Sequence, residues 1–95
     1  MHIITRKRLN EFAEKHPDTR PALAHWYGLM KEKQVRSFVE LRMIFPGADQ
    51  VGQLTVFNIG GGKARLIEAI HYNRQKVYVR AILTHDEYDK GKWRE

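Results

Sequence analysis

The residues best suited to catalysis lie in the second half of the chain, on and beside three segments with strand-like alternation. We expect one end of this sheet to gather an amide, two cations, an imidazole and a phenol, from Asn58, Lys63, Arg65, His85 and Tyr88. A further cation, Arg80, lies about four residues, roughly 13 Å, along the sheet. A guanidinium matches phosphate oxygens in two-point contacts, and imidazole and phenol groups can transfer protons. The set therefore favours chemistry on a phosphate.

Cleavage of RNA is one reaction that such groups can catalyse without a metal. The substrate carries its own nucleophile, because the 2′-hydroxyl can attack the neighbouring phosphate. The protein then has to accept a proton, stabilise the charge on the phosphorane and protonate the leaving 5′-oxygen. The same residues also suit passive RNA binding, since the rings of Tyr78 or Tyr88 can stack on unpaired bases. The residue types alone leave both functions open.

Other classes of site are disfavoured by the sequence. There is no carboxylate cluster or histidine pair at metal-ligand spacing, and no serine–histidine–aspartate pattern. The glycines at 60–62 lack the phosphate-loop pattern and stand between two predicted strands, which indicates a turn. No helix-turn-helix with a basic recognition face is visible, so direct DNA binding is not expected.

The composition is that of a small basic protein. The 95 residues predict one domain, residues 1–95, with a net charge of +6 and no cysteine. Excess positive charge favours contact with a polyanion. No apolar run approaches the roughly 18 residues of a membrane span. The start of the chain has apolar residues before basic ones, the wrong order for a signal peptide, so we expect a cytoplasmic protein.

Helices are predicted in the first half of the chain. Residues 2–5 favour a short strand, and residues 6–15 favour a helix that Thr5 caps. A second helix follows, with Asp18 or Thr19 as its cap. Its apolar stripe, which we assign to the core, consists of Leu23, Trp26, Tyr27 and Met30.

A short third helix is predicted from a capping box of Ser37 and Glu40. Its inward residues are Phe38, Leu41 and Phe45. Residues 48–52 are expected to form a loop.

Three strands are predicted after this loop, over residues 54–59, 64–72 and 76–84. Two-residue turns at Gly61-Gly62 and Arg74-Gln75 would join them. The pairs that these turns predict are Asn58 with Arg65, Arg65 with Thr84, Ala69 with Arg80, and His71 with Tyr78.

This register assigns each side chain to a face of the sheet, because opposed residues share a face. The solvated face would carry Asn58, Arg65, His71, Tyr78 and Arg80. The face against the helices would carry Leu66, Glu68, Ile70, Tyr72, Val77, Val79, Ala81 and Leu83. Glu68 is the charged residue of that inner set, so we expect it to have a partner or to reach water.

A second capping box, Thr84 with Glu87, predicts a helix directly after the last strand. His85 and Tyr88 would then share one face of that helix. The helix dipole disfavours an imidazolium at this position, which would help His85 to act as a base. We expect Arg65 and His85 to converge on one open hollow. The basic tail that follows, 89–95, is expected either to fray or to dock through its tryptophan.

Several of these segments together resemble the HigB family of bacterial toxins, within the RelE-like superfamily of mRNA interferases. The resemblance rests on the run VFNIGGGKARLIEAIHYNRQKVYVRAILTHDEYDKGKW, the opening MHIITRKRL and the segment SFVELRMIFPGAD. Its most specific parts are the glycine turn with the K-x-R-L hairpin and the ending T-H-x-E-Y-D. It covers nearly the whole chain.

The resemblance implies an α+β fold, with two N-terminal helices and a short third helix packed on a twisted, mainly antiparallel sheet. It implies metal-independent cleavage of mRNA, often on the ribosome. It also implies a HigA-type helix-turn-helix antitoxin as partner, through which contact with DNA is indirect, and no cofactor.

By position, the resemblance places Arg65 at the scissile phosphate and His85 and Tyr88 beside it as catalytic residues. RNA contacts then fall to Asn58, Lys63, Arg80 and Lys90. The chain departs from many RelE-like toxins in having no lysine on the strand before the glycine turn, residues 54–58. His85 is therefore our preferred general base. The alternative to a toxin nuclease is a non-catalytic RNA-binding module that regulates translation.

Overall fold

The N-terminal layer of the protein consists of two antiparallel helices beside a short strand. A computed structural model describes residues 1–94. It begins with β1 (His2–Ile4), α1 (Arg6–Lys15), the 3-10 turn η1 (Pro17–Thr19) and α2 (Arg20–Glu32). These elements confirm the predicted strand and both predicted helices. No helix among the described residues is long and apolar enough to cross a membrane.

The predicted side-chain caps of these two helices are wrong. Thr5 precedes α1 in a left-handed conformation, with φ 73°, and its side chain makes no capping bond. Thr19 precedes α2, but its hydroxyl donates to the carbonyl of His16 at 2.7 Å. Thr19 itself has helical φ and ψ, so α2 continues directly from η1 and starts without a side-chain cap.

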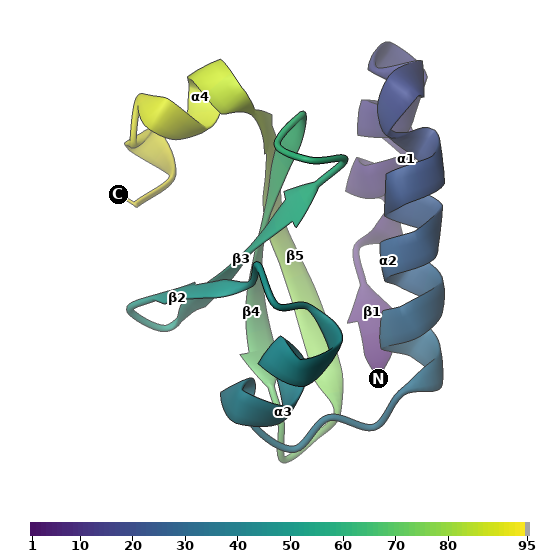
Figure 1. Ribbon diagram of the computed structural model, residues 1–95, viewed down its shortest axis with the longest axis vertical. Coiled ribbons are helices and arrows are strands. Elements are labelled where there is room, and N and C mark those ends of the chain that lie inside the picture. Colours follow the sequence, from purple (N-terminus) through teal and green to yellow (C-terminus); the bar gives the residue numbers. More distant parts are fainter. Residues whose placement is uncertain (95) are drawn as a thin grey trace.

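A five-stranded sheet forms the second layer. After α3 (Phe38–Ile44) come β2 (Asp49–Val51), β3 (Leu54–Ile59), β4 (Ala64–His71) and β5 (Lys76–Thr84), in the spatial order β1-β5-β4-β3-β2. Only the β1–β5 pair among the described strands is parallel. Figure 1 shows α1 and α2 on one side of this sheet and α4 (His85–Asp89) on the other, before the 3-10 turn η2 (Lys92–Arg94). The predicted α+β class is confirmed.

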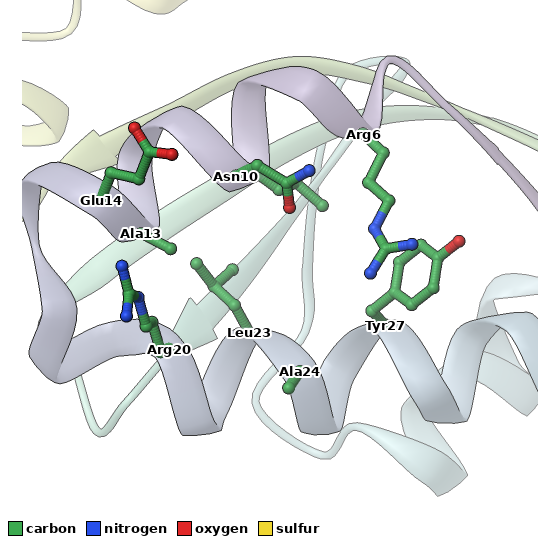
Figure 2. A pocket seen from close by; sticks show the side chains of 9 residues that line it. Arg6, Asn10, Ala13, Glu14, Arg20, Leu23, Ala24 and Tyr27 are labelled. Atoms are coloured by element: carbon green, nitrogen blue, oxygen red, sulfur yellow. The ribbon is translucent and has the colours of Figure 1, made fainter.

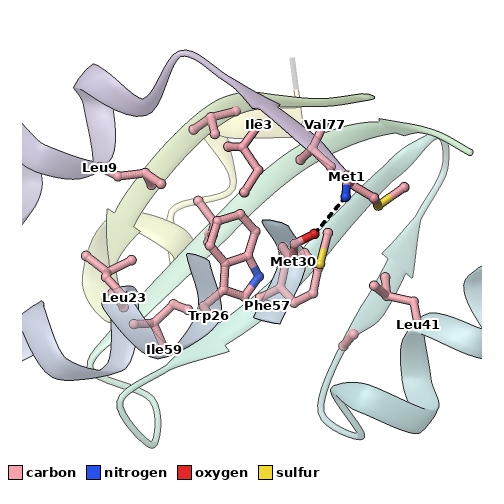
Figure 3. Packing of buried hydrophobic residues seen from close by; sticks show 14 of the residues in the cluster. Met1, Ile3, Leu9, Leu23, Trp26, Met30, Leu41, Phe57, Ile59 and Val77 are labelled. Carbon is pink, nitrogen blue, oxygen red and sulfur yellow. Dashed lines mark hydrogen bonds between the residues drawn. The ribbon is translucent and has the colours of Figure 1, made fainter. Parts of the chain in front are cut away.

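The hydrophobic core lies between the sheet and the helical layer (Figure 3). Trp26 of α2 meets the ring of Phe57 of β3 edge-on, with ring centroids 5.5 Å apart. Phe45, just after α3, meets the same ring at 5.2 Å. The amino group of Met1 donates to the carbonyl of Met30 at 3.0 Å, which joins β1 to the end of α2. As predicted, the stripe on α2 belongs to the core.

The hairpin between β3 and β4 has the predicted register. Asn58 faces Arg65, and the last pair is Ile59 with Ala64, so the connection is a four-residue loop rather than a two-residue turn. The glycines at 60–62 all have positive φ, between 64° and 102°. Such φ values strain residues that carry a Cβ, which explains three glycines in a row.

The predicted register of β4 against β5 is wrong. The last pair before the turn is His71 with Lys76, and Gln75 closes the turn with φ 54°. Tyr78 therefore faces Ala69, not His71, and Arg65 faces Leu83, not Thr84. Because His71 forms the last pair, β4 ends at His71, one residue before the predicted end at Tyr72.

A β-bulge at Ile67/Glu68 causes the remaining error. It leaves Arg80 as the extra residue between Val79 and Ala81, so Arg80 does not face Ala69. A shift of one residue along a strand moves each side chain to the other face of the sheet. Ala81, which was predicted on the inner face, therefore lies on the outer face with Ile67. Leu83 likewise shares a face with Arg65. The backbone carbonyl of Arg80 accepts a hydrogen bond from the guanidinium of Arg8 on α1.

Two further expectations are overturned. Residues 49–51 of the predicted loop pair with β3 as the short edge strand β2, a segment too short to show alternation. Glu68 is fully buried, and neither carboxylate oxygen has a hydrogen-bond partner among the described residues. Burial raises the pKa of Glu68 well above its ordinary value, because it disfavours the charged carboxylate.

The predicted cap of α3 forms in part. The Ser37 hydroxyl accepts from the backbone N–H of Glu40 at 3.2 Å. The Glu40 carboxylate, however, accepts from the N–H of Arg36 and not from that of Ser37. Leu41 is buried, and Phe38 and Phe45 pack against the core as expected.

Candidate functional site

A hollow of about 380 Å³ opens on the sheet face opposite α1 and α2. Parts of five elements surround it: α3 and the segment after it, β2, β3, β4 and α4. Its lining residues are Arg42, Pro46, Gly47, Ala48, Asp49, Val56, Asn58, Arg65 and Tyr88. The hollow thus brings together residues that lie up to 46 positions apart in the sequence, from 42 to 88.

Arg65 and Tyr88 form the best-defined contact of the hollow. The guanidinium of Arg65 lies over the Tyr88 ring, 5.4 Å from its centroid. The other aromatic contact of Tyr88 is a stack on Trp93, with centroids 4.9 Å apart and planes 13° apart. Trp93 also donates from Nε1 to the carbonyl of Tyr88 at 3.0 Å. Trp93 therefore docks and supports the ring that meets Arg65, which confirms docking through the tryptophan as one of the two expected outcomes. Residue 95 of the tail lies outside the described residues.

Local sequence explains why α4 begins where it does. The Thr84 hydroxyl accepts from the N–H of Glu87 at 3.3 Å, and the Glu87 carboxylate accepts from the N–H of Thr84 at 3.0 Å. The predicted capping box is confirmed. The backbone hydrogen bond from Thr84 holds the pKa of Glu87 below its ordinary value. This cap fixes the first turn of α4 and so the position of Tyr88 above β4.

The opposite wall of the hollow comes from α3 and the segment that follows it. The Arg42 guanidinium donates to the carbonyl of Pro46 at 3.1 Å, which holds the side chain across the end of α3. Gly47 lies close to Asn58, since a Cβ on Gly47 would be 3.5 Å from the Asn58 amide nitrogen. The pairing of Asn58 with Arg65 then places this amide beside the arginine.

The charges in the hollow are two guanidinium groups and one carboxylate. None of Arg42, Arg65 and Asp49 forms an ion pair with any residue that the structure describes. Arg65 donates to the Ala64 carbonyl at 3.5 Å, a long bond that leaves most of its donors open. Open donors of this kind suit an anionic ligand such as a phosphodiester.

Of the predicted site residues, Asn58, Arg65 and Tyr88 lie together in the hollow, and four others do not line it. Lys63 extends from the glycine turn toward Asp18, with its amino group 3.7 Å from the carboxylate. His85 begins α4, half-exposed, with Nδ1 3.1 Å from a carboxylate oxygen of Asp89. Arg80 is exposed at the bulge, as described above.

Lys90, the fourth, lines a separate hollow of about 450 Å³ on the far side of α4. Its neighbours there include Leu83 and Trp93. The expected meeting of Arg65 and His85 in one hollow is therefore not seen. Tyr88, one turn along the same helix, lines the hollow with Arg65 instead.

Two lining residues, Arg42 and Asp49, were missed by sequence reasoning. Arg42 lies on a helix whose inward residues alone were considered. Asp49 lies in the segment predicted as a loop, and it directly follows the Pro46–Ala48 bend. The quoted segment SFVELRMIFPGAD contains both residues, so the resemblance itself marked the stretch without assigning it a role.

A third hollow, also of about 450 Å³, lies between α1 and α2 on the other side of the molecule (Figure 2). The guanidinium of Arg6 lies over the Tyr27 ring there, 4.0 Å from its centroid. None of the predicted site residues lines it. This cation–π contact lies within the protein and closes one end of the hollow. The Arg6 side chain thus has a partner in the protein itself, and its position does not require a ligand.

Comparison with known proteins assigns this chain to a family. Residues 19–91 match the model of a family described as HigB toxin, the RelE-like toxic component of a toxin–antitoxin system. The chain belongs to the HigB toxin family. The family resemblance and the RelE-like fold expected from the sequence are thus confirmed.

Relatives of this HigB-family toxin carry names that state an activity. This chain is 34% identical over 92 residues to the mRNA interferase toxin HigB of Escherichia coli K12, and the match covers 94% of this chain and 88% of that protein. It is equally similar to the mRNA interferase HigB of Shigella flexneri. It is 33% identical over 93 residues to the mRNA interferase HigB of Escherichia coli O6:H1, covering 95% and 90%. An mRNA interferase is an endoribonuclease, and a toxin of a toxin–antitoxin system has an antitoxin partner.

Proposed function

We propose that this protein is an endoribonuclease that cuts mRNA, on translating ribosomes, by attack of the RNA 2′-hydroxyl on the adjacent phosphate. The observation that carries the proposal is the convergence of Arg65 and Tyr88, from β4 and α4, on one open hollow. Both groups sit where a phosphodiester can reach them. The names of the relatives state mRNA interferase activity, which supports the cleavage of mRNA.

Each group has a role that follows from its chemistry. The Arg65 guanidinium stabilises the charge that accumulates on the phosphorane. Two groups of α4 are candidates for proton transfer: Tyr88, which lines the hollow, and His85, three residues before it. Asn58 offers an amide to the RNA from the floor. Lys63, Arg80 and Lys90 do not line the hollow, and in this proposal they contact the RNA backbone outside it.

The antitoxin partner is proposed to be a HigA-type helix-turn-helix protein. The toxin would then meet DNA only through this partner, which fits a chain that lacks a basic recognition helix of its own. The protein would act in the cytoplasm, where translating ribosomes are found.

Brief expression in growing cells, followed by primer-extension mapping of cellular mRNA, tests the proposal. We expect new 5′ ends within coding sequences and growth arrest. Arg65→Ala should lower cleavage by about 10²- to 10³-fold, because it removes the main stabiliser of the transition state. Arg20→Ala, on the opposite side of the sheet, is the matched control and should stay toxic.

The alternative, an RNA-binding regulator without catalysis, predicts a different result. Growth would stop without new mRNA ends, and Arg65→Ala would weaken RNA binding only. Absence of cuts under conditions where the folded protein is present at toxic levels would therefore rule out the nuclease.

A further inference from the structure

Asp49 is an unexpected residue in a hollow built for an anion. It is the first residue of β2 and faces Val56 in the register of β2 and β3. The hollow that it lines also contains Arg42 and Arg65. A carboxylate at this place repels phosphate, so it weakens the electrostatic attraction between the hollow and RNA.

The surroundings of Asp49 do not neutralise this charge. The carboxylate forms no ion pair with any residue in the described chain, although two guanidinium groups line the same hollow. Its Oδ1 accepts from the backbone N–H of Gln50 at 2.9 Å, and this bond fixes the orientation of the carboxylate. Within residues 1–94, no hydrogen bond to Oδ2 is present. An oriented carboxylate with one open oxygen is suited to accept a proton from a bound ligand.

We propose that Asp49 is the general base of the cleavage reaction, which rests on the proposed function. The Oδ2 atom takes the proton of the RNA 2′-hydroxyl as the 2′-oxygen forms a bond to phosphorus. The bond from phosphorus to the 5′-oxygen breaks, and that oxygen leaves with the proton of the Tyr88 hydroxyl. The products are a 2′,3′-cyclic phosphate and a 5′-hydroxyl end. Exchange of protons with water then restores Asp49 and Tyr88.

The arrangement of the hollow fits this division of roles. Asp49 belongs to β2, and Tyr88 belongs to α4, so the base and the acid come from separate elements that line the same space. A displacement at phosphorus needs the attacking and leaving oxygens on opposite sides of it. Arg65 belongs to β4, under Tyr88, where it can neutralise the phosphorane. His85 lies outside the lining and meets Asp89, so it is less well placed to accept the 2′-proton.

The variant Asp49→Asn tests the proposal, because it keeps the shape of the side chain and removes the basic oxygen. Translating ribosomes on a defined mRNA serve as the substrate, and the cleavage rate is measured with enzyme in excess. We expect the rate to fall by about 10²- to 10⁴-fold, the usual contribution of a general base. Asp86→Asn removes an exposed carboxylate of α4 that does not line the hollow, and it should cut at the wild-type rate.

Binding is measured separately, on an RNA whose 2′-hydroxyl groups are methylated so that it cannot be cut. Asp49→Asn should bind this RNA as tightly as the wild type or more tightly, because a repulsive charge is gone. Asp49→Glu keeps a carboxylate and should recover part of the lost rate. This combination separates a base from a residue that only supports β2, since a structural role would lower binding together with the rate.

Two outcomes would overturn the proposal while leaving the proposed nuclease intact. One is cleavage by Asp49→Asn at the wild-type rate. The other is a parallel loss of binding and rate in that variant, without recovery by Asp49→Glu. If the wild-type protein itself cuts no mRNA, the proposed function fails, and the role of Asp49 fails with it.

Discussion

At the scale of single residues, Glu68 and Arg65 illustrate opposite uses of a charged side chain on one strand. They lie on opposite faces of β4, three positions apart. Arg65 reaches the open hollow, while Glu68 is fully buried with no hydrogen-bond partner in the described chain. The sheet thus separates a site for charge from a core that excludes charge, and Glu68 can belong to that core only in its protonated form.

This burial predicts that the protein loses stability as pH rises. Glu68 ordinarily has a pKa of 4.5, and burial raises it well above that value in the folded state. Below pH 4.5 both the folded and the unfolded chain hold the proton. At higher pH the unfolded chain releases it first, so the free energy of unfolding falls by about 1.4 kcal/mol per pH unit until the folded-state pKa is passed.

Urea denaturation at several pH values between 5 and 9 checks this prediction. Glu68→Gln cannot ionise, and its free energy of unfolding should lack this decline. Glu14→Gln, at an exposed position of α1, is the matched control and should follow the wild type. Equal pH dependence in the wild type and in Glu68→Gln would contradict the prediction.

Some residues of the candidate site could be predicted from the sequence, and others could not. Arg65 and Asn58 were predictable, because the glycine turn fixes their pairing over a short distance. Tyr88 was predictable from the capping box. Arg42 and Asp49 were not, because their place in the hollow depends on how the bend after α3 returns to the sheet edge. No periodic pattern records such a bend.

At the scale of elements, the sequence indicated the helices and the long strands but not their exact alignment. Apolar spacing places α1, α2, β3, β4 and β5, since each buries one regular face. The alignment of β4 and β5 depends instead on a turn closed by a left-handed Gln75 and on the bulge opposite Ile67/Glu68. One local and one tertiary bond hold the turn: the Gln75 side chain donates to the carbonyl of Tyr72 and to that of Val35. Contacts with residue 35 are invisible in a local reading of residues 72–75.

The capping box of α4 provides a prediction at this scale. Thr84→Ala removes the hydroxyl that accepts from Glu87, which should cost about 1 kcal/mol of stability. The expected fall in Tm is about 4–8 °C for a domain of this size. Because the cap fixes the start of the helix that carries Tyr88, mRNA cleavage should fall more than binding of the methylated RNA.

Ser37→Ala is the matched control, since it removes the analogous hydroxyl from α3. Thermal denaturation should show a similar loss of stability, while the cleavage rate measured well below both Tm values should stay near that of the wild type. If both variants lose cleavage equally, the cap of α4 has no special link to the site.

At the scale of the whole molecule, the sheet divides the surface into two sides with different contents. The α1–α2 side has a groove in which Arg6 is engaged by Tyr27. The other side has the hollow in which Arg42 and Arg65 have no ionic partner within the described residues. The net charge of +6 favours a polyanion as a candidate ligand but does not distinguish these two sides. Under the proposed function, the side of the sheet on which a cation lies decides whether it can meet RNA.

This asymmetry predicts how RNA binding depends on salt. Each phosphate of a single strand that a cation neutralises adds about 0.7 to the slope of log K against log salt concentration. Arg42→Ala removes one guanidinium from the hollow, so the slope for the methylated RNA should become shallower by about 0.7. Arg20→Ala removes the same charge from the α1–α2 side and should leave the slope unchanged. Titrations at several salt concentrations measure both, and equal slopes in the two variants would mean that RNA binds through the diffuse charge of the protein and not through this hollow.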